Sequence, residues 1–223
     1  MPVVVDLDGT FLVVDSLRLL RLRLRLLRPH RVFASRRERA RGKDALKLYL
    51  WEQAGLRVER LPVNRALLAW LEAQAAQGRT VVLATGSAQG LAEEVASHYP
   101  VFSEVIGTTP GRNLTGAAKG AALVERFGER GFDYAGDSAA DLAVWAHARR
   151  AILCNVTDEV RAAVADLCGV EADLRSPARP WALDAIRALG HGWRPRRASP
   201  RADHDAREKN ININLVRILY LLS

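Results

Sequence analysis

The fold is decided by the stretch Val3-Val4-Val5-Asp6-Leu7-Asp8-Gly9-Thr10. Its three valines form a short β-branched run that is typical of a buried parallel strand. Two carboxylates, Asp6 and Asp8, follow the run, and Gly9 allows the chain to turn sharply. Because ligands bind outside the carboxyl ends of the strands in an open α/β sheet, we expect chemistry at this point. The alternative is a surface turn, which Asp and Gly favour in any case.

The composition indicates a globular protein. The chain has 223 residues, of which 49% are hydrophobic and 26% charged; this length suits one α/β domain with an insertion, or one domain and a tail. The net charge of +8 comes mainly from arginine. Such a charge is compatible with nucleic acid, an anionic membrane or phosphate-bearing substrates. We attribute the arginine bias mainly to a GC-rich coding sequence and expect no nucleic acid partner.

The cysteines and the hydropathy pattern suggest a cytoplasmic location. Cys154 and Cys168 lie in apolar surroundings without metal-ligand spacing, which indicates buried, reduced thiols. The N-terminus leads directly into the first strand, so we expect no signal peptide. No uninterrupted apolar run approaches the length of a membrane-spanning helix. No obligate protein partner is inferred.

A leucine- and arginine-rich helix is expected over Leu17–Arg28, with Asp15 or Ser16 as its N-cap and Pro29 at its end. Four arginines share one face of this helix: Arg18, Arg21, Arg25 and Arg28. Two interpretations stay open. The helix could lie on an anionic membrane surface, or it could be a cap helix with a solvated face.

Further helices are expected before the second strand. Residues Arg31–Arg41 are expected to form a loop or to fray, whereas Lys43–Gln53 and Val63–Gln77 carry apolar residues at helical spacing. Two or three helices between the first two strands exceed the dozen or so residues that a simple crossover needs. The sequence therefore predicts a helical insertion after the first strand.

The second strand, Thr80–Ala84, ends in Thr85-Gly86-Ser87. A hydroxyl at a strand tip, followed by exposed backbone amides, can hold a phosphate. Alternatively, Ser87 simply caps the helix expected over Ala88–Tyr99. A third strand is expected over Val101–Ile106.

Lys119 stands where the helix Gly120–Phe127 begins. The helix dipole disfavours an ammonium at this end, so an anionic partner is plausible, the alternative being a solvated lysine. The next strand, Phe132–Asp137, ends in an acidic residue, and Asp141 follows one helical turn later. Carboxylates from here and from Asp6 would form an oxygen-ligand site suited to Mg2+. The remaining elements are expected to be strand 150–156, helix 158–168 and strand 170–174.

Taken in order, four stretches resemble the motifs of the haloacid dehalogenase (HAD) superfamily: Asp6-Leu7-Asp8-Gly9-Thr10, Thr85, Lys119 and Gly136-Asp137-Ser138-x-x-Asp141. The resemblance covers residues 3 to about 175. It implies an α/β, Rossmann-like three-layer fold, in which helices flank a parallel sheet and a small helical cap follows the first strand. The implied core comprises residues 1–15 and 76–189, the cap 16–75, and a basic linker or tail 190–223.

The resemblance also implies a role for each motif residue. Asp6 would be the nucleophile that forms an aspartyl-phosphate, and Asp8 the general acid/base. Thr85 would hold the phosphoryl group and Lys119 would neutralise its charge. The remaining residues would bind substrate or metal: Gly9, Thr10, Gly86 and Ser87 the substrate, and Asp6, Asp8 and Asp137, supported by Asp141, the Mg2+ ion.

The implied activity is Mg2+-dependent hydrolysis of a small-molecule phosphate monoester. Physical chemistry is consistent with it, because a carboxylate attacks a phosphate dianion only when cations cancel their repulsion. Transfer of the phosphoryl group to a second metabolite is an alternative.

A narrower resemblance concerns residues 116–128 and 132–137, which are similar to the HAD domain fused ahead of bacterial UbiA-type prenyltransferases. The match reaches about Leu189, after which come a polar linker and a short apolar end, Leu215–Leu222, in place of membrane helices. No prenyltransferase activity is therefore implied. The fusion context suggests a prenyl- or sugar-phosphate substrate at the inner face of the membrane. The second alternative is a non-catalytic membrane-surface module left from such a fusion.

Overall fold

The computed structural model describes residues 1–175. Its six strands are β1 (Val3–Val5), β2 (Val81–Ala88), β3 (Glu104–Thr108), β4 (Asp133–Gly136), β5 (Arg150–Cys154) and β6 (Gly169–Leu174). They form one sheet in the order β3-β2-β1-β4-β5-β6, and every neighbouring pair is parallel. The order reverses between β1 and β4, which is the switch point where open α/β sheets bind ligands.

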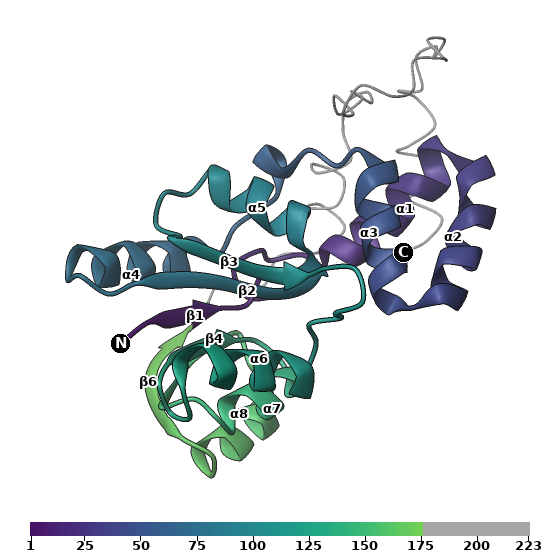
Figure 1. Ribbon diagram of the computed structural model, residues 1–223. Helices are drawn as coiled ribbons and strands as arrows, with labels where there is room; N and C mark the ends of the chain where they lie inside the picture. Colours follow the sequence, from purple (N-terminus) through teal and green to yellow (C-terminus); the bar gives the residue numbers. More distant parts are fainter. Residues whose placement is uncertain (176–223) are drawn as a thin grey trace.

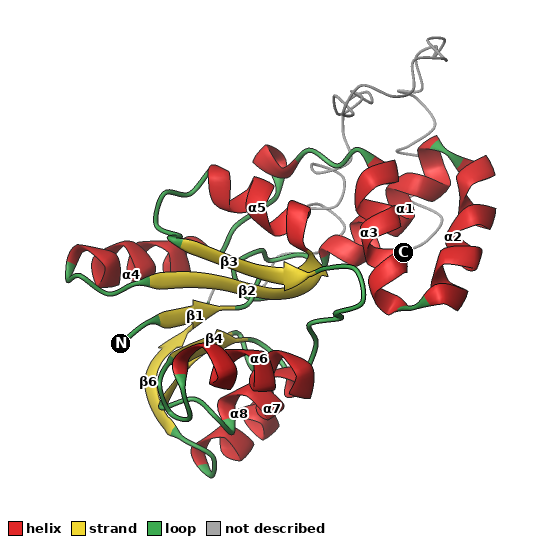
Figure 2. Cartoon of the chain, in the orientation of Figure 1, coloured by secondary structure: helices red, strands yellow, loops and turns green. Residues whose placement is uncertain are grey.

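Helices cover both faces of this sheet (Figures 1 and 2). The helices that follow β2 are α5 (Gln89–Ser97), α6 (Ala117–Phe127), η2 (Ala139–Asp141), α7 (Leu142–Trp145) and α8 (Asp158–Ala165). Alternate residues of β1 point to opposite faces. Val3 and Val5 share one apolar cluster with α4 (Arg65–Ala76) and α5, whereas Val4 shares the other with α6, α7 and α8. The predicted parallel three-layer α/β fold is therefore confirmed.

The insertion between β1 and β2 contains α1 (Ser16–Leu27), α2 (Pro29–Arg41), α3 (Lys43–Ala54), η1 (Val58–Arg60) and α4 (Arg65–Ala76). Figure 1 shows α1, α2 and α3 beyond the carboxyl ends of β2 and β3, whereas α4 lies along the sheet. Leu67 and Leu71 of α4 are fully buried in the core cluster of that face. That residues 16–75 work as a cap stays a prediction.

The prediction of a loop or frayed segment over Arg31–Arg41 is wrong, because these residues belong to helix α2. Pro29 follows α1 as expected, but it also occupies the first turn of α2, where its missing N–H costs nothing. None of the residues of α2 is buried, so its apolar pattern gave little signal, while its alanine and arginine residues favour a helix. The insertion thus has four α-helices rather than two or three.

Helix α1 begins as predicted, with the Asp15 side chain accepting a hydrogen bond from the Arg18 backbone N–H at 2.9 Å. Arg18 and Arg25 are exposed on its arginine face. Arg23, on the leucine face, is buried and donates from Nε to the Ala54 carbonyl at 2.8 Å. The α1 helix is therefore fixed to the end of α3.

Cys154 and Cys168 are free and buried, as predicted. Within residues 1–175, none of the helices is long and apolar enough to cross a bilayer. The end of the expected core, 176–189, and the tail, 190–223, lie outside the described residues.

Candidate active site

The candidate site lies at the carboxyl ends of β1 and β4, where the chain turns away from the sheet. The turn after β1 depends on Gly9, whose φ of +81° suits glycine. A Cβ atom on Gly9 would overlap the carboxylate of Asp137. The Asp6 N–H donates to the Ala135 carbonyl of β4 at 3.0 Å. The two strand ends are therefore held close enough for their acidic residues to share one site.

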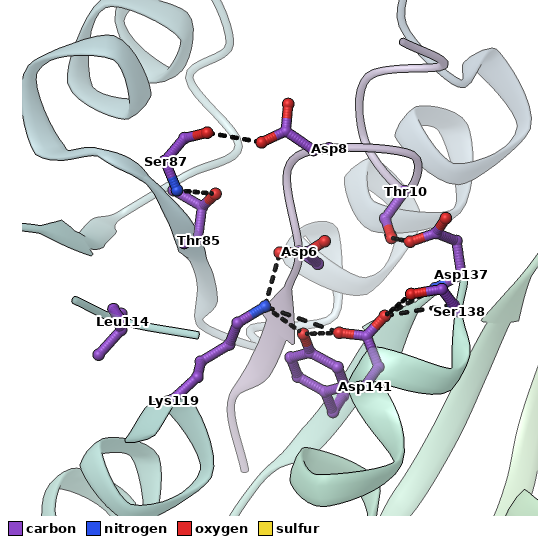
Figure 3. Close-up of polar contacts among 12 residues, drawn as sticks. Asp6, Asp8, Thr10, Thr85, Ser87, Leu114, Lys119, Asp137, Ser138 and Asp141 are labelled. Carbon is purple, nitrogen blue, oxygen red and sulfur yellow. Dashed lines mark hydrogen bonds and ion pairs between the residues drawn. The ribbon is translucent and has the colours of Figure 1, made fainter. Parts of the chain in front are cut away.

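Lys119 reaches this site from the first turn of α6 (Figure 3). Its Nζ donates to Asp6 Oδ1 at 2.7 Å and lies 3.6 Å from Asp141 Oδ1. The side chain is only 6% exposed, so the alternative of a solvated lysine is wrong. Burial opposes its charge, but Asp6 and Asp141 outweigh that effect and raise the pKa of Lys119. The ammonium therefore stays protonated beside Asp6.

Asp141 is held in place by donors on both of its oxygens. Oδ1 accepts from the Tyr134 hydroxyl at 2.7 Å, and Oδ2 accepts from the backbone N–H groups of Asp137 and Ser138 at 3.2 and 3.3 Å. The Ser138 hydroxyl adds a further contact to Oδ2 at 3.3 Å, and η2 follows. This arrangement suits a residue that shapes the loop after β4 and supports the site.

Asp6, Asp137 and Asp141 each place one carboxylate oxygen within 4.8 Å of the others. Burial, together with the charge of Asp141, raises the pKa of Asp137 to about 7. Burial raises the pKa of Asp6 to about 8 despite the neighbouring Lys119. One ammonium thus leaves negative charge uncompensated. A hard cation with oxygen ligands, such as Mg2+, fits both this donor set and this charge.

Asp8 points away from the cluster, toward Ser87 (Figure 3). Its Oδ1 accepts from the Ser16 N–H at 2.7 Å and its Oδ2 from the Ser87 hydroxyl at 2.6 Å. Burial raises the pKa of Asp8, and the two serines offset part of that rise. A raised pKa favours the protonated form of this carboxyl group, which is the form that a general acid needs.

The segment after β2 supplies hydroxyl groups to the same edge. The Thr85 hydroxyl is buried and accepts from the Ser87 N–H at 3.0 Å. The Gly86 carbonyl accepts from the Thr108 hydroxyl at 2.7 Å. Ser87 does not cap a helix, because β2 extends to Ala88 and α5 begins at Gln89 without a side-chain cap. The capping alternative for Ser87 is wrong.

Thr10 is fully buried and donates to Asp137 Oδ1 at 3.1 Å. Its hydroxyl therefore positions a carboxylate of the cluster. That Thr10 and Gly9 contact a substrate stays a prediction, as do the expected contacts of Gly86 and Ser87.

Sequence reasoning missed three residues at this site. Tyr134, expected only as a strand residue, accepts from Lys119 Nζ at 2.7 Å while it donates to Asp141. Ser16, considered only as a cap, binds Asp8 through its backbone. Lys47 of α3 contacts Gly86. For Tyr134 a signal existed, since a buried tyrosine hydroxyl needs a partner; the other two contacts depend on how the insertion folds back.

The fold is that of an α/β protein, and at the switch point of its sheet Asp6, Asp137 and Asp141 form a cluster of carboxylates whose oxygens could hold a metal ion. The chain belongs to the haloacid dehalogenase-like hydrolases, since that family matches residues 3–146. It is 29% identical over 197 residues to the uncharacterized protein y4nM of Sinorhizobium fredii. The alignment covers 86% of this chain and 37% of that protein's length.

Solved structures share the fold. A protein of unknown function from Bordetella pertussis Tohama I matches with a TM-score of 0.58 at 18% identity, over 78% of this chain and 98% of its own. A probable phosphoserine phosphatase from Vibrio cholerae matches with a TM-score of 0.53 at 14% identity, over 85% of this chain and 65% of its own. At such identities these structures support the fold and leave the substrate open.

Proposed function

We propose that this protein is a Mg2+-dependent phosphomonoester hydrolase that works through an aspartyl-phosphate on Asp6. The observation that carries the proposal is the buried contact between Asp6 and Lys119 beside two further carboxylates. Asp6 can attack phosphorus once cations balance the negative charge of these carboxylates, because the repulsion between a carboxylate and a phosphate dianion is then removed. Similarity to phosphoserine phosphatase folds is consistent with this choice of reaction.

In the first step, Asp6 attacks phosphorus through the oxygen that Lys119 does not bind. The bond from phosphorus to the alcohol oxygen breaks, and Asp8 gives its proton to that oxygen. Thr85 and the backbone N–H groups at the end of β2 hold the phosphoryl oxygens. Positioning and charge neutralisation supply most of the catalysis in such transfers.

In the second step, water attacks the aspartyl-phosphate while Asp8 accepts a proton from it. The bond between phosphorus and Asp6 breaks, which releases phosphate and restores the carboxylate. Asp6, Asp137 and the Asp8 carbonyl would hold Mg2+, with Asp141 in support; when bound, the ion would offset the negative charge of the phosphoryl oxygens. Lys119, held by Tyr134 and Asp141, keeps its ammonium against Asp6 in both steps.

We further propose that residues 16–75 act as a cap that closes over the site and selects the substrate. The contact of Asp8 with Ser16 places the start of α1 directly on the proposed acid. Closure of the insertion over Asp8 would then exclude water from the site. A prenyl- or sugar-phosphate remains the proposed substrate class from the sequence.

Peripheral membrane contact is a second proposal for the same insertion. The exposed Arg18 and Arg25 of α1 and the basic helix α2 present positive charge, and Phe33 of α2 is 70% exposed. A basic helix with an exposed aromatic side chain can bind anionic lipid. Flotation with anionic liposomes tests this: we expect Arg18→Gln, Arg21→Gln and Arg25→Gln together to reduce it, and unchanged flotation would contradict it.

The hydrolase proposal is tested by measuring phosphate release from a panel of phosphate monoesters, with Mg2+ and with EDTA. We expect turnover that needs Mg2+ and disappears in Asp6→Asn. Turnover that survives in Asp6→Asn would reject the nucleophile assignment. Adding candidate acceptor alcohols and analysing the products distinguishes hydrolysis from phosphotransfer.

A further inference from the structure

Lys47 brings a second cation to the edge of the site from the insertion. It lies in the middle of α3, the helix that Figure 1 shows beyond the carboxyl ends of β2 and β3. Its Nζ donates to the Gly86 carbonyl at 2.5 Å and to Asn113 Oδ1 at 2.7 Å. Both acceptors are neutral. Among residues 1–175, Lys47 forms no ion pair within 4.0 Å, although Asp44 and Asp8 act on it from further away.

Lys47 and Lys119 differ in the charge of their partners. Lys119 is committed to Asp6 and Asp141, so its charge already balances protein carboxylates. Lys47 is half-buried, and burial lowers its pKa to about 8. Removing an ammonium from water without an anionic partner costs free energy. A bound anion would compensate for that cost.

The position of Lys47 indicates which part of a substrate it meets. Asp8 exerts the largest electrostatic attraction on Lys47, and Ser87, next to Gly86, donates to Asp8. In the proposed mechanism Asp8 protonates the departing alcohol. The ammonium therefore lies on the side of the site where the alcohol part of the ester leaves.

We propose that Lys47 is a specificity residue that binds an anionic group, a carboxylate or a second phosphate, on the alcohol part of the substrate. The neutral oxygens of Gly86 and Asn113 hold the ammonium in position until the substrate arrives. The preferred substrates are then phosphate monoesters with a second negative charge. This inference rests on the proposed hydrolase function and narrows its substrate class: a sugar phosphate with a second anionic group satisfies it, whereas a prenyl monophosphate does not.

The test compares two esters that differ by one charge, 2-phosphoglycolate and ethyl phosphate, on the full chain with Mg2+. We expect the wild type to prefer 2-phosphoglycolate. Lys47→Met should raise KM for 2-phosphoglycolate by about ten- to 150-fold, the range for loss of a hydrogen bond to a charged group, with little change in kcat. KM for ethyl phosphate should stay within about twofold. Lys47→Arg should restore part of the preference.

Lys43→Met is the matched control, because Lys43 is exposed one turn earlier on the same helix. It removes the same charge and should leave both KM values unchanged. Equal effects of Lys47→Met on the two esters, or a similar effect of Lys43→Met, would overturn the inference and leave the hydrolase proposal intact.

Absence of all turnover would instead reject the hydrolase proposal, and binding then decides about Lys47. Calorimetric titration of 2-phosphoglycolate into Asp6→Asn protein, with and without Lys47→Met, provides this measurement. We expect the second substitution to weaken binding at least tenfold. Equal affinity in the two proteins would overturn the inference. Circular dichroism and thermal melts confirm that each variant is folded.

Discussion

The two edges of the sheet both bury carboxylates, but they balance the charge differently. At the amino edge, Asp133 at the start of β4 is fully buried and pairs with Arg79 and with Arg149, whose Nη2 lies 2.5 Å away. Arg79 also binds Glu171 at 2.8 Å. At the carboxyl edge, four residues later on the same strand and turn, Asp137 lies among further aspartates with Lys119.

The pKa values follow this difference. Burial tends to raise the pKa of Asp133, but hydrogen bonds and charge from Arg149, together with the charge of Arg79, outweigh burial and lower it. Burial and the charge of Asp141 raise the pKa of Asp137 to about 7, because the Thr10 hydroxyl and Lys119 offset only part of that rise. A balanced cluster stabilises the fold, whereas an unbalanced one attracts a cation and an anionic substrate. The comparison predicts which substitutions affect activity and which affect stability.

The largest expected effect separates the two edges by activity. Asp6→Asn should lower the hydrolysis rate by about 10³-fold or more, because the nucleophile is lost. Asp133→Asn should leave the rate per folded molecule within about threefold, since its side chain binds Arg79 and Arg149 at the opposite ends of the strands. Initial rates, corrected for the folded fraction by circular dichroism, provide the measurement. A comparable loss in Asp133→Asn would break the proposed division between the edges.

Stability should respond in the opposite way. Asp133→Asn leaves two arginines beside a neutral amide, and we expect it to cost about 3 kcal/mol of unfolding free energy. Asp6→Asn, measured without Mg2+, should cost much less, because it removes a carboxylate whose pKa is raised to about 8. Urea denaturation measures both. Asp166→Asn, at an exposed position, is the control and should change stability by less than about 0.5 kcal/mol.

The stability contribution of Asp133 should depend on pH with a definite sign. Its pKa is lower in the folded state than in the unfolded chain, so the unfolded state binds its proton first as the pH falls. The contribution is therefore complete above about pH 4, the usual aspartate value, and is lost at lower pH. Urea titrations at pH 7, 5, 4 and 3 give the free energy of unfolding of wild type and of Asp133→Asn. The difference between the two proteins should narrow only below pH 4. A difference in unfolding free energy that narrows between pH 7 and 5 would contradict a lowered pKa of Asp133 in the folded state.

How much the sequence could predict also differs between regions of the molecule. The β1 strand and the acidic residues after it were predictable, because a valine run and a turn glycine are local signals. The partners of Asp8 were not, since Ser16 and Ser87 meet only when the insertion folds back on β2. Helix α2 was missed because it buries none of its residues and so lacks an apolar stripe.

The ion pairs at the amino edge were not predicted at all. Arg79, Asp133 and Arg149 are far apart in sequence and follow no recognisable motif. Their pairing depends on the order of the strands, which places the starts of β2, β4 and β5 near one another. Ion pairs of this kind are visible only in three dimensions, whereas the site residues follow strand ends that a sequence reveals.

The smallest expected effect concerns Mg2+ binding to the folded protein. A ligand at ten times its Kd stabilises the folded state by about 1.4 kcal/mol, which is about 3 °C in Tm for a chain of this size. We expect Mg2+ to give this shift in wild type and in Asp133→Asn, and EDTA to reverse it. Asp137→Asn should lose the shift, because it removes a ligand charge while its amide oxygen can still accept from Thr10. A shift in Tm that survives in Asp137→Asn but disappears in Asp133→Asn would place the cation at the amino edge and contradict the proposed Mg2+ site.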